Sequence, residues 1–155
     1  HGNRCPFEDP NARGMFFNIS LETGKTELIR AVVEGTCMHL RWFLETEDKK
    51  TKTSDVLRFV GGGALSDVTC QILADCTGRT VEVVASPQNV GAVGAAVISA
   101  VGLGMIGSIE EAKKLVPAKK TFIPNPSLKP IYDKNFAVFK NLYKSNKENF
   151  EALNG

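Results

Sequence analysis

The sequence has few of the side chains that hold metal ions. Only two of its 155 residues are histidine, and the four cysteines, Cys5, Cys37, Cys70 and Cys76, include no C-x-x-C pair. Because structural zinc sites need closely spaced pairs of such ligands, we expect no metal site in this chain. All the cysteines except Cys5 lie in apolar helical patterns, as buried reduced thiols do, so we expect a cytoplasmic protein.

The sequence also lacks a strong charge of one sign and a long unbroken apolar run. Its formal net charge of +2 is too small to indicate a nucleic-acid partner or an anionic membrane surface. Five glycines interrupt the richest apolar run, residues 90–109, whereas a membrane-spanning helix needs about 20 consecutive apolar residues. We therefore expect neither nucleic acid nor membrane among the partners.

What the sequence does contain is an alternation of β-prone runs and helical periodicities. Short β-prone runs bounded by turn-forming residues predict strands at residues 15–19, 56–60 and 80–84. Apolar residues at helical spacing predict helices at residues 28–44, 66–76, 90–101, 108–116 and 132–143. Loops are expected at residues 1–14 and 45–55, and the prolines of residues 121–130 predict an irregular segment. This order is typical of an α/β fold in which helices flank a sheet.

Two glycine patterns resemble nucleotide-binding motifs but stand in the wrong context. Gly24, Lys25 and Thr26 look like the end of a phosphate-binding loop, yet Ile19 occupies the place of its first glycine. Residues 102–107 match the dinucleotide fingerprint G-x-G-x-x-G, but they follow a predicted helix instead of a strand. We interpret both patterns as ordinary helix ends.

A third glycine pattern, residues 61–64, lies directly between a predicted strand and a predicted helix. Glycines without a Cβ atom allow a flat ring or a phosphate to approach the backbone closely. The following helix offers free N–H groups to an anion, and Ser66 and Asp67 stand in its first turn. The pattern alone fits either a nucleotide-binding turn or a tight structural turn without a ligand.

The surroundings of this turn resemble the adenosine motif of the FGGY family of carbohydrate kinases. That motif is a G-G-G-A-x-S turn followed by a helix with Gln, Ala-Asp and Gly. Here residues 60–67 read V-G-G-G-A-L-S-D, Gln71 follows, and residues 74–78 read A-D-C-T-G. We interpret Asp75, within this helix, as a buried structural residue.

Three further segments resemble the family's motifs in the family's order. Residues 4–14 resemble the E-R-x-P…P-x-A-R-G segment, although Asn3 stands where the family usually has glutamate. Residues 28–35 resemble the L-x-R-A-x-x-E-G helix, and residues 91–96 resemble the G-A-x-G-A-A helix. Within the first of these helices, we interpret Arg30 and Glu34 as an ion pair on one helix face.

The resemblance implies part of an actin-like, RNase H-like ATPase domain. Residues 1–155 would form the C-terminal nucleotide-binding domain of a xylulokinase-like enzyme, and a chain that begins with His1 is expected to be a piece of a longer protein. The family's general base, phosphate motifs and sugar site belong upstream, so we expect no catalytic residue here. The nucleotide contacts that the resemblance implies are Gly61, Gly62, Gly63, Ala64, Ser66, Asp67, Gln71 and Asn89.

The implied reaction is phosphorylation of D-xylulose by ATP, with Mg²⁺ held by residues outside this chain. Kinases of ribulose, gluconate or glycerol are the alternatives within the family, and a non-enzymatic actin-like nucleotide-binding module is the alternative of another class. ATP and a sugar are therefore the expected partners. A homodimer is also possible, because strands left without neighbours tend to pair between chains.

Overall fold

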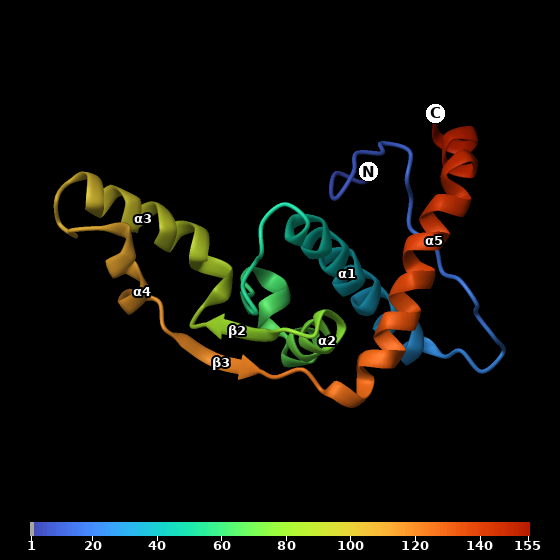
Figure 1. Cartoon of the computed structure of the whole chain (residues 1–155), viewed down its shortest axis with the longest axis horizontal. Helices are drawn as coiled ribbons and strands as arrows, with labels where there is room; N and C mark the ends of the chain where they lie inside the picture. Colours follow the sequence, from blue (N-terminus) through green and yellow to red (C-terminus); the bar gives the residue numbers. More distant parts are fainter. Residues whose placement is uncertain (1) are drawn as a thin grey trace. The chain divides into compact units, whose positions relative to one another are not determined.

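The computed structural model describes residues 2–155, and the chain divides into two compact units. One unit contains residues up to 53, residues 75–77 and residues 125–155; the other contains residues 54–74 and 78–124. No helix in the described part of the chain is long and apolar enough to cross a membrane. Figure 1 shows the helices and strands along the chain.

The first unit is built mainly from two long helices, α1 (Lys25–Asp48) and α5 (Lys129–Asn154). Their apolar faces meet around Trp42 of α1, whose ring lies with its centroid 6.2 Å from that of Phe139 of α5. Cys37 and Met38 of α1 are buried, as are the aromatic side chains of α5 that share its inner face, Tyr132, Phe136 and Phe150. Burial of these large side chains is the main stabilising contribution in this unit.

The N-terminal loop is attached to α5 through Phe7 and Asp9. The ring of Phe7 lies 4.2 Å from that of Tyr143 between centroids. The carboxylate of Asp9 accepts a hydrogen bond from the Tyr143 hydroxyl at 2.7 Å and from the amides of Asn11 and Ala12 at 2.9 and 3.2 Å. These donors, the tyrosine first, hold the pKa of Asp9 below its ordinary value and so keep the carboxylate charged.

The second unit contains a three-stranded sheet of order β1-β2-β3. β1 (Val56–Arg58) pairs in parallel with β2 (Thr80–Val84), and β2 pairs antiparallel with β3 (Ala118–Phe122), which runs beside it in Figure 1. The chain passes from β1 to β2 through a 3-10 turn, η1 (Gly62–Leu65), and the helix α2 (Asp67–Thr77). A parallel pair needs such a crossover, and this crossover contains the glycine turn.

The centre of the second unit lies between β2 and the first turns of α2. Val81, Val83 and Val84 of β2 are buried, and so are Cys70 and Ile72 of α2. After β2 the chain forms the 3-10 turn η2 (Pro87–Asn89), the apolar helix α3 (Val90–Gly102), the turn η3 (Ile109–Glu111) and the short helix α4 (Ala112–Leu115). The chain then returns along β2 as β3.

Most of the predicted elements are present. The structure confirms the predicted helices in α1, α2, α3 and α5, and the strand at residues 80–84. Some bounds differ. α1 continues through Asp48 into the expected loop, β1 ends at Arg58, and only a short α4 follows η3. α5 begins at Lys129 and has a proline in its first turn. Proline lacks a backbone N–H, and in the first turn of a helix that group would have no acceptor within the helix.

Two predictions about strands were wrong. Residues 15–19 form no strand, and Met15, Phe16, Phe17 and Ile19 are 42–63% exposed. A β-prone run becomes a strand only where a neighbour pairs with it, and among the described residues none does. Conversely, residues 118–122 form β3, although residues 121 and 122 were expected to be irregular. This strand was missed because most of its side chains are exposed and polar, which removes the alternation that identifies strands.

Candidate nucleotide-binding site

The glycine turn is fixed in place by Gly61. This residue has φ +89° and ψ −171°, a conformation that side chains with a Cβ atom rarely adopt. Its N–H donates a hydrogen bond of 2.9 Å to the carbonyl of Pro87, in the turn that follows β2. The carbonyl of Gly61 in turn accepts from the N–H of Ala64 at 3.2 Å. Gly61 therefore joins the segments that follow two neighbouring strands.

Gly62 and Gly63 differ in the space around the position that a Cβ atom would occupy. A Cβ atom on Gly63 would lie 3.0 Å from Cζ of Phe59, so this glycine makes room for a neighbouring ring. A Cβ atom on Gly62 would meet nothing within 4 Å, and its φ lies outside the positive range that favours glycine. The fold itself gives no reason for a glycine at position 62. Its exposed, bare backbone is open to the close approach of a flat ligand.

Ser66 and Asp67 form the beginning of α2. The Ser66 side chain caps the helix, because its Oγ accepts a hydrogen bond from the N–H of Thr69 at 3.3 Å. Asp67 follows as the first residue of the helix, and its carboxylate pairs with the Nζ of Lys120 at 2.7 and 2.8 Å. Of the two polar side chains, Ser66 caps α2 and Asp67 pairs with a lysine of β3.

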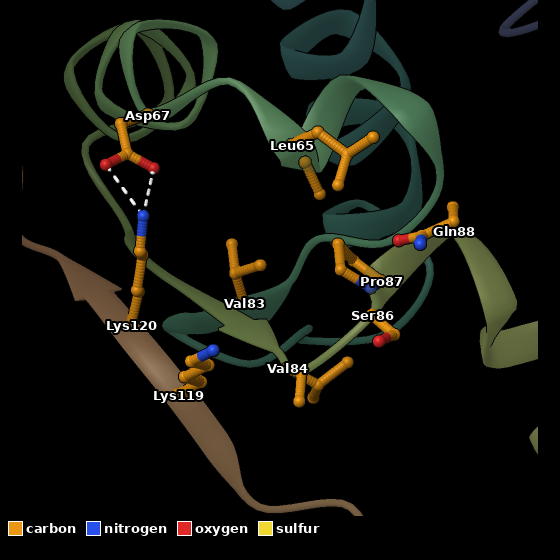
Figure 2. A pocket seen from close by; sticks show the side chains of 11 residues that line it. Leu65, Asp67, Val83, Val84, Ser86, Pro87, Gln88, Lys119 and Lys120 are labelled. Carbon is orange, nitrogen blue, oxygen red and sulfur yellow. Dashed lines mark hydrogen bonds and ion pairs between the residues drawn. The ribbon is translucent and has the colours of Figure 1, made fainter.

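A cavity of about 250 Å³ lies beside this turn. Figure 2 shows side chains from η1, α2, β2 and β3 around it. Its walls are partly apolar and partly charged, and they include Ala64, Leu65, Val83, Pro87, Lys119 and Lys120. The cavity thus combines apolar surface with two ammonium groups and the carboxylate of Asp67.

The predicted contacts are distributed unevenly around this cavity. Of the eight predicted contacts, Ala64 and Asp67 line it, and the other six do not belong to its lining: Gly61, Gly62, Gly63, Ser66, Gln71 and Asn89. The Gln71 side chain donates a hydrogen bond to the carbonyl of Ile123 at 2.9 Å. The backbone N–H of Asn89 donates to the carbonyl of Ser86 at 2.9 Å, in the turn between β2 and α3. Their role as nucleotide contacts, like that of the other predicted residues, stays a prediction.

No pattern in the sequence indicates that two lysines line the cavity. Lys119 and Lys120 lie on β3, the strand that was not predicted, so nothing connected them with the glycine turn. Ser86 was also missed; it lines the cavity with φ +51° and ψ +56°, a left-handed conformation that is rare outside glycine. Recognising that the polar residues 118–122 pair with the buried strand β2 would have placed the two lysines beside the cavity.

The buried thiol of Cys70 lies next to the glycine turn. Burial raises the pKa of Cys70, with the charge of Asp67 as a second cause, and its Sγ lies 3.7 Å from the carbonyl oxygen of Ala64. Among the described residues there is no cluster of three His, Cys, Asp or Glu side chains that could hold a metal ion. Since Asp67 already pairs with Lys120, these residues do not fit a magnesium site.

The other glycine motifs are helix ends, as predicted. α1 begins at Lys25, and the N–H of Gly24 donates to the Glu27 carboxylate at 3.1 Å. Gly102 is the last residue of α3, and Gly104 follows with φ +70°. The two structural assignments are also confirmed. Arg30 and Glu34 pair at 2.8 Å, and the buried Asp75 accepts from the N–H of Asn125 at 2.8 Å.

Comparison with known proteins gives one consistent family. Residues 1–103 match the family described as "FGGY family of carbohydrate kinases, C-terminal domain". The chain is 33% identical over 150 residues to the xylulose kinase of Lactococcus lactis, covering 95% of this chain and 30% of that protein. It is 31% identical over 159 residues to an FGGY carbohydrate kinase domain-containing protein of Xenopus laevis, covering 100% of this chain and 28% of the relative.

Solved structures agree with this assignment. The xylulose kinase from Lactobacillus acidophilus superposes with a TM-score of 0.86 at 26% identity, over 97% of this chain and 30% of that one. The gluconate kinase from the same organism gives a TM-score of 0.84 at 25% identity, over 94% and 30%. These likenesses confirm the expected actin-like α/β fold, and the chain spans about 30% of the length of these relatives. The chain belongs to the FGGY family of carbohydrate kinases, of which it matches the C-terminal domain.

Proposed function

We propose that this chain supplies the adenosine-binding part of a kinase that transfers the γ-phosphoryl group of ATP to D-xylulose. The observation that carries the proposal is Gly62, whose bare backbone is exposed at a turn that Gly61 connects to Pro87 by a hydrogen bond. A nucleotide ring that lies against this backbone would explain a glycine that the fold does not require. Xylulose kinases recur among the similar sequences and structures, which supports this sugar.

In this proposal the chain binds and orients the nucleotide. The apolar surfaces of Leu65 and Pro87 would cover the adenosine, and the Asp67 carboxylate would accept a hydrogen bond from a ribose hydroxyl or an amino group. Enzymes accelerate phosphoryl transfer mainly through positioning and charge neutralisation, with Mg²⁺ neutralising charge on the phosphates. The general base, the sugar site and the metal ligands are proposed to lie outside these 155 residues.

A second candidate sugar is gluconate, because a gluconate kinase structure resembles this chain nearly as well as the xylulose kinase does. A glycerol kinase of Saccharolobus islandicus, 30% identical over 127 residues, supports glycerol in the same way. Cytoplasmic location is also part of the proposal, since Cys70 and Cys76 are buried thiols outside any disulfide. Self-association through an unpaired strand edge stays a prediction.

Sugar-dependent release of ADP tests the proposed reaction. With the intact protein, we expect D-xylulose to give the highest kcat/KM among xylulose, ribulose, gluconate and glycerol. The 155-residue chain alone is expected to give no sugar-dependent release, because the resemblance assigns the catalytic base elsewhere. A preference for gluconate would change the sugar and keep the kinase. Binding of ATP without any sugar-dependent turnover by the intact protein would favour the non-enzymatic module.

A further inference from the structure

The side chain of Lys120 connects β3 with the beginning of α2. Its Nζ lies 2.7 Å from Oδ1 and 2.8 Å from Oδ2 of Asp67, so it contacts both carboxylate oxygens, as the dashed lines in Figure 2 show. The two residues are 53 positions apart in the sequence. The pairing of β3 with β2 brings them together, since Lys120 lies opposite Val83 in the sheet.

Stability alone does not account for this ion pair. The side chains of Lys120 and Asp67 are 51% and 58% exposed. Pairs with this exposure contribute only about 0–1 kcal/mol to folding, because water screens the charges and two long side chains lose freedom. Asp67 is already well placed without the lysine, since a carboxylate at the first residue of a helix interacts favourably with the helix dipole.

The position of the Lys120–Asp67 pair connects it with nucleotide binding. Both residues line the cavity beside the glycine turn, where we propose that the nucleotide binds. A free carboxylate there would repel a ligand that carries several negative charges on its phosphates. Lys120 cancels that charge. A carboxylate has about four lone-pair positions and the lysine uses two, so Asp67 still has room to accept a hydrogen bond.

We propose that Lys120 is a positioning residue for the nucleotide, acting through Asp67. It holds the Asp67 carboxylate in one orientation and neutralises it, so that Asp67 accepts a hydrogen bond from the adenosine without repelling the phosphates. The inference rests on the proposed function. It adds to that function a residue from a strand that carries none of the family's glycine motifs.

Lys119 provides a matched control. It precedes Lys120 on β3 and lines the same cavity, but in the described part of the chain it makes no ion pair. A Lys119→Met variant therefore removes the same charge from the same cavity without touching Asp67. Lys120→Met removes the charge and the contact together, and Lys120→Arg restores a cation that reaches a carboxylate.

Calorimetric titration of ADP and of adenosine into the intact protein tests the inference. Lys120→Met is expected to weaken ADP binding about threefold to tenfold, and Lys119→Met to weaken it less than about twofold. Lys120→Arg should restore most of the affinity. In the Asp67→Asn background, Lys120→Met should have almost no further effect, because there is no carboxylate left to hold or neutralise. Adenosine should lose less affinity than ADP, since it lacks the phosphates.

Each of the other outcomes overturns the inference. If Lys120→Met binds ADP like the wild type, the pair has no role in binding. If Lys119→Met loses as much affinity, or if the loss persists in the Asp67→Asn background, Lys120 acts only as a general cation. These results leave the proposed function intact. If the wild-type protein itself binds no ADP, the proposed function fails and this inference fails with it.

Discussion

Replacing Gly62 by valine is expected to weaken ATP binding to the intact protein about tenfold to a hundredfold. The substitution puts a branched side chain where a Cβ atom now meets nothing within 4 Å, which is where the nucleotide ring is proposed to lie. Forcing extra methyl groups into a closely packed contact costs about 1–3 kcal/mol, and 1.4 kcal/mol corresponds to tenfold in affinity. Because the backbone conformation at position 62 suits any residue, the fold should tolerate the change.

Gly63→Val is a poorer test of the same idea. A Cβ atom at this position would lie only 3.0 Å from the ring of Phe59, so the variant would disturb the turn before any ligand arrives. Gly35→Val serves as the control, since that glycine in α1 also has open space around it. Titration calorimetry with ATP and with sugar compares the two. Unchanged ATP affinity in Gly62→Val, with the thermal melting temperature preserved, would contradict the placement of the nucleotide.

Replacing Arg41 by alanine is expected to lower the free energy of unfolding of the first unit by about 3 kcal/mol. The Arg41 side chain, only 16% exposed, pairs with Asp133 of α5 at 2.7 Å and with Glu45 at 3.2 Å. It also donates to the carbonyl of Cys76 at 3.0 Å, and its guanidinium lies 4.4 Å from the centroid of the Phe136 ring. Its removal leaves several partly buried acceptors without their donor at once.

Arg30→Ala is the matched control for this prediction. Arg30 lies on the same helix, but its side chain is 58% exposed and pairs with Glu34, one turn away. Its loss should cost less than about 1 kcal/mol. Urea unfolding, followed by the fluorescence of Trp42, the single tryptophan of the 155 residues, reports on the unit that contains both arginines. Equal losses in the two variants would show that the Arg41 network adds nothing beyond an ordinary surface pair.

The helices and the buried strand were predictable because their sequence periods follow directly from burial on one face. α1 repeats apolar residues at helical spacing, and β2 is a short β-prone run between Gly78 and Ser86. The glycine turn was predictable for a different reason. Gly61 requires a positive φ and Gly63 has to leave room for Phe59, so the turn depends on residue types that remain visible in the sequence.

The rest of the site depended on pairing between distant segments, which no local pattern reveals. Residues 15–19 have the composition of a strand but no partner in the described structure, and they stay exposed. β3 has the opposite character, since Lys119 and Lys120 are polar and exposed but pair with the buried β2. Because β3 was missed, both lysines of the cavity and the partner of Asp67 were missed with it.

The most direct test of the central claim is amide hydrogen exchange in the intact protein with and without ATP. If the glycine turn binds adenosine, ATP should slow the exchange of the amides of residues 61–67, while D-xylulose alone should leave them unchanged. The amides in the middle of α5 serve as the internal reference. Sugar-dependent ADP release together with unaltered exchange at residues 61–67 would contradict the account, because the nucleotide would then bind elsewhere.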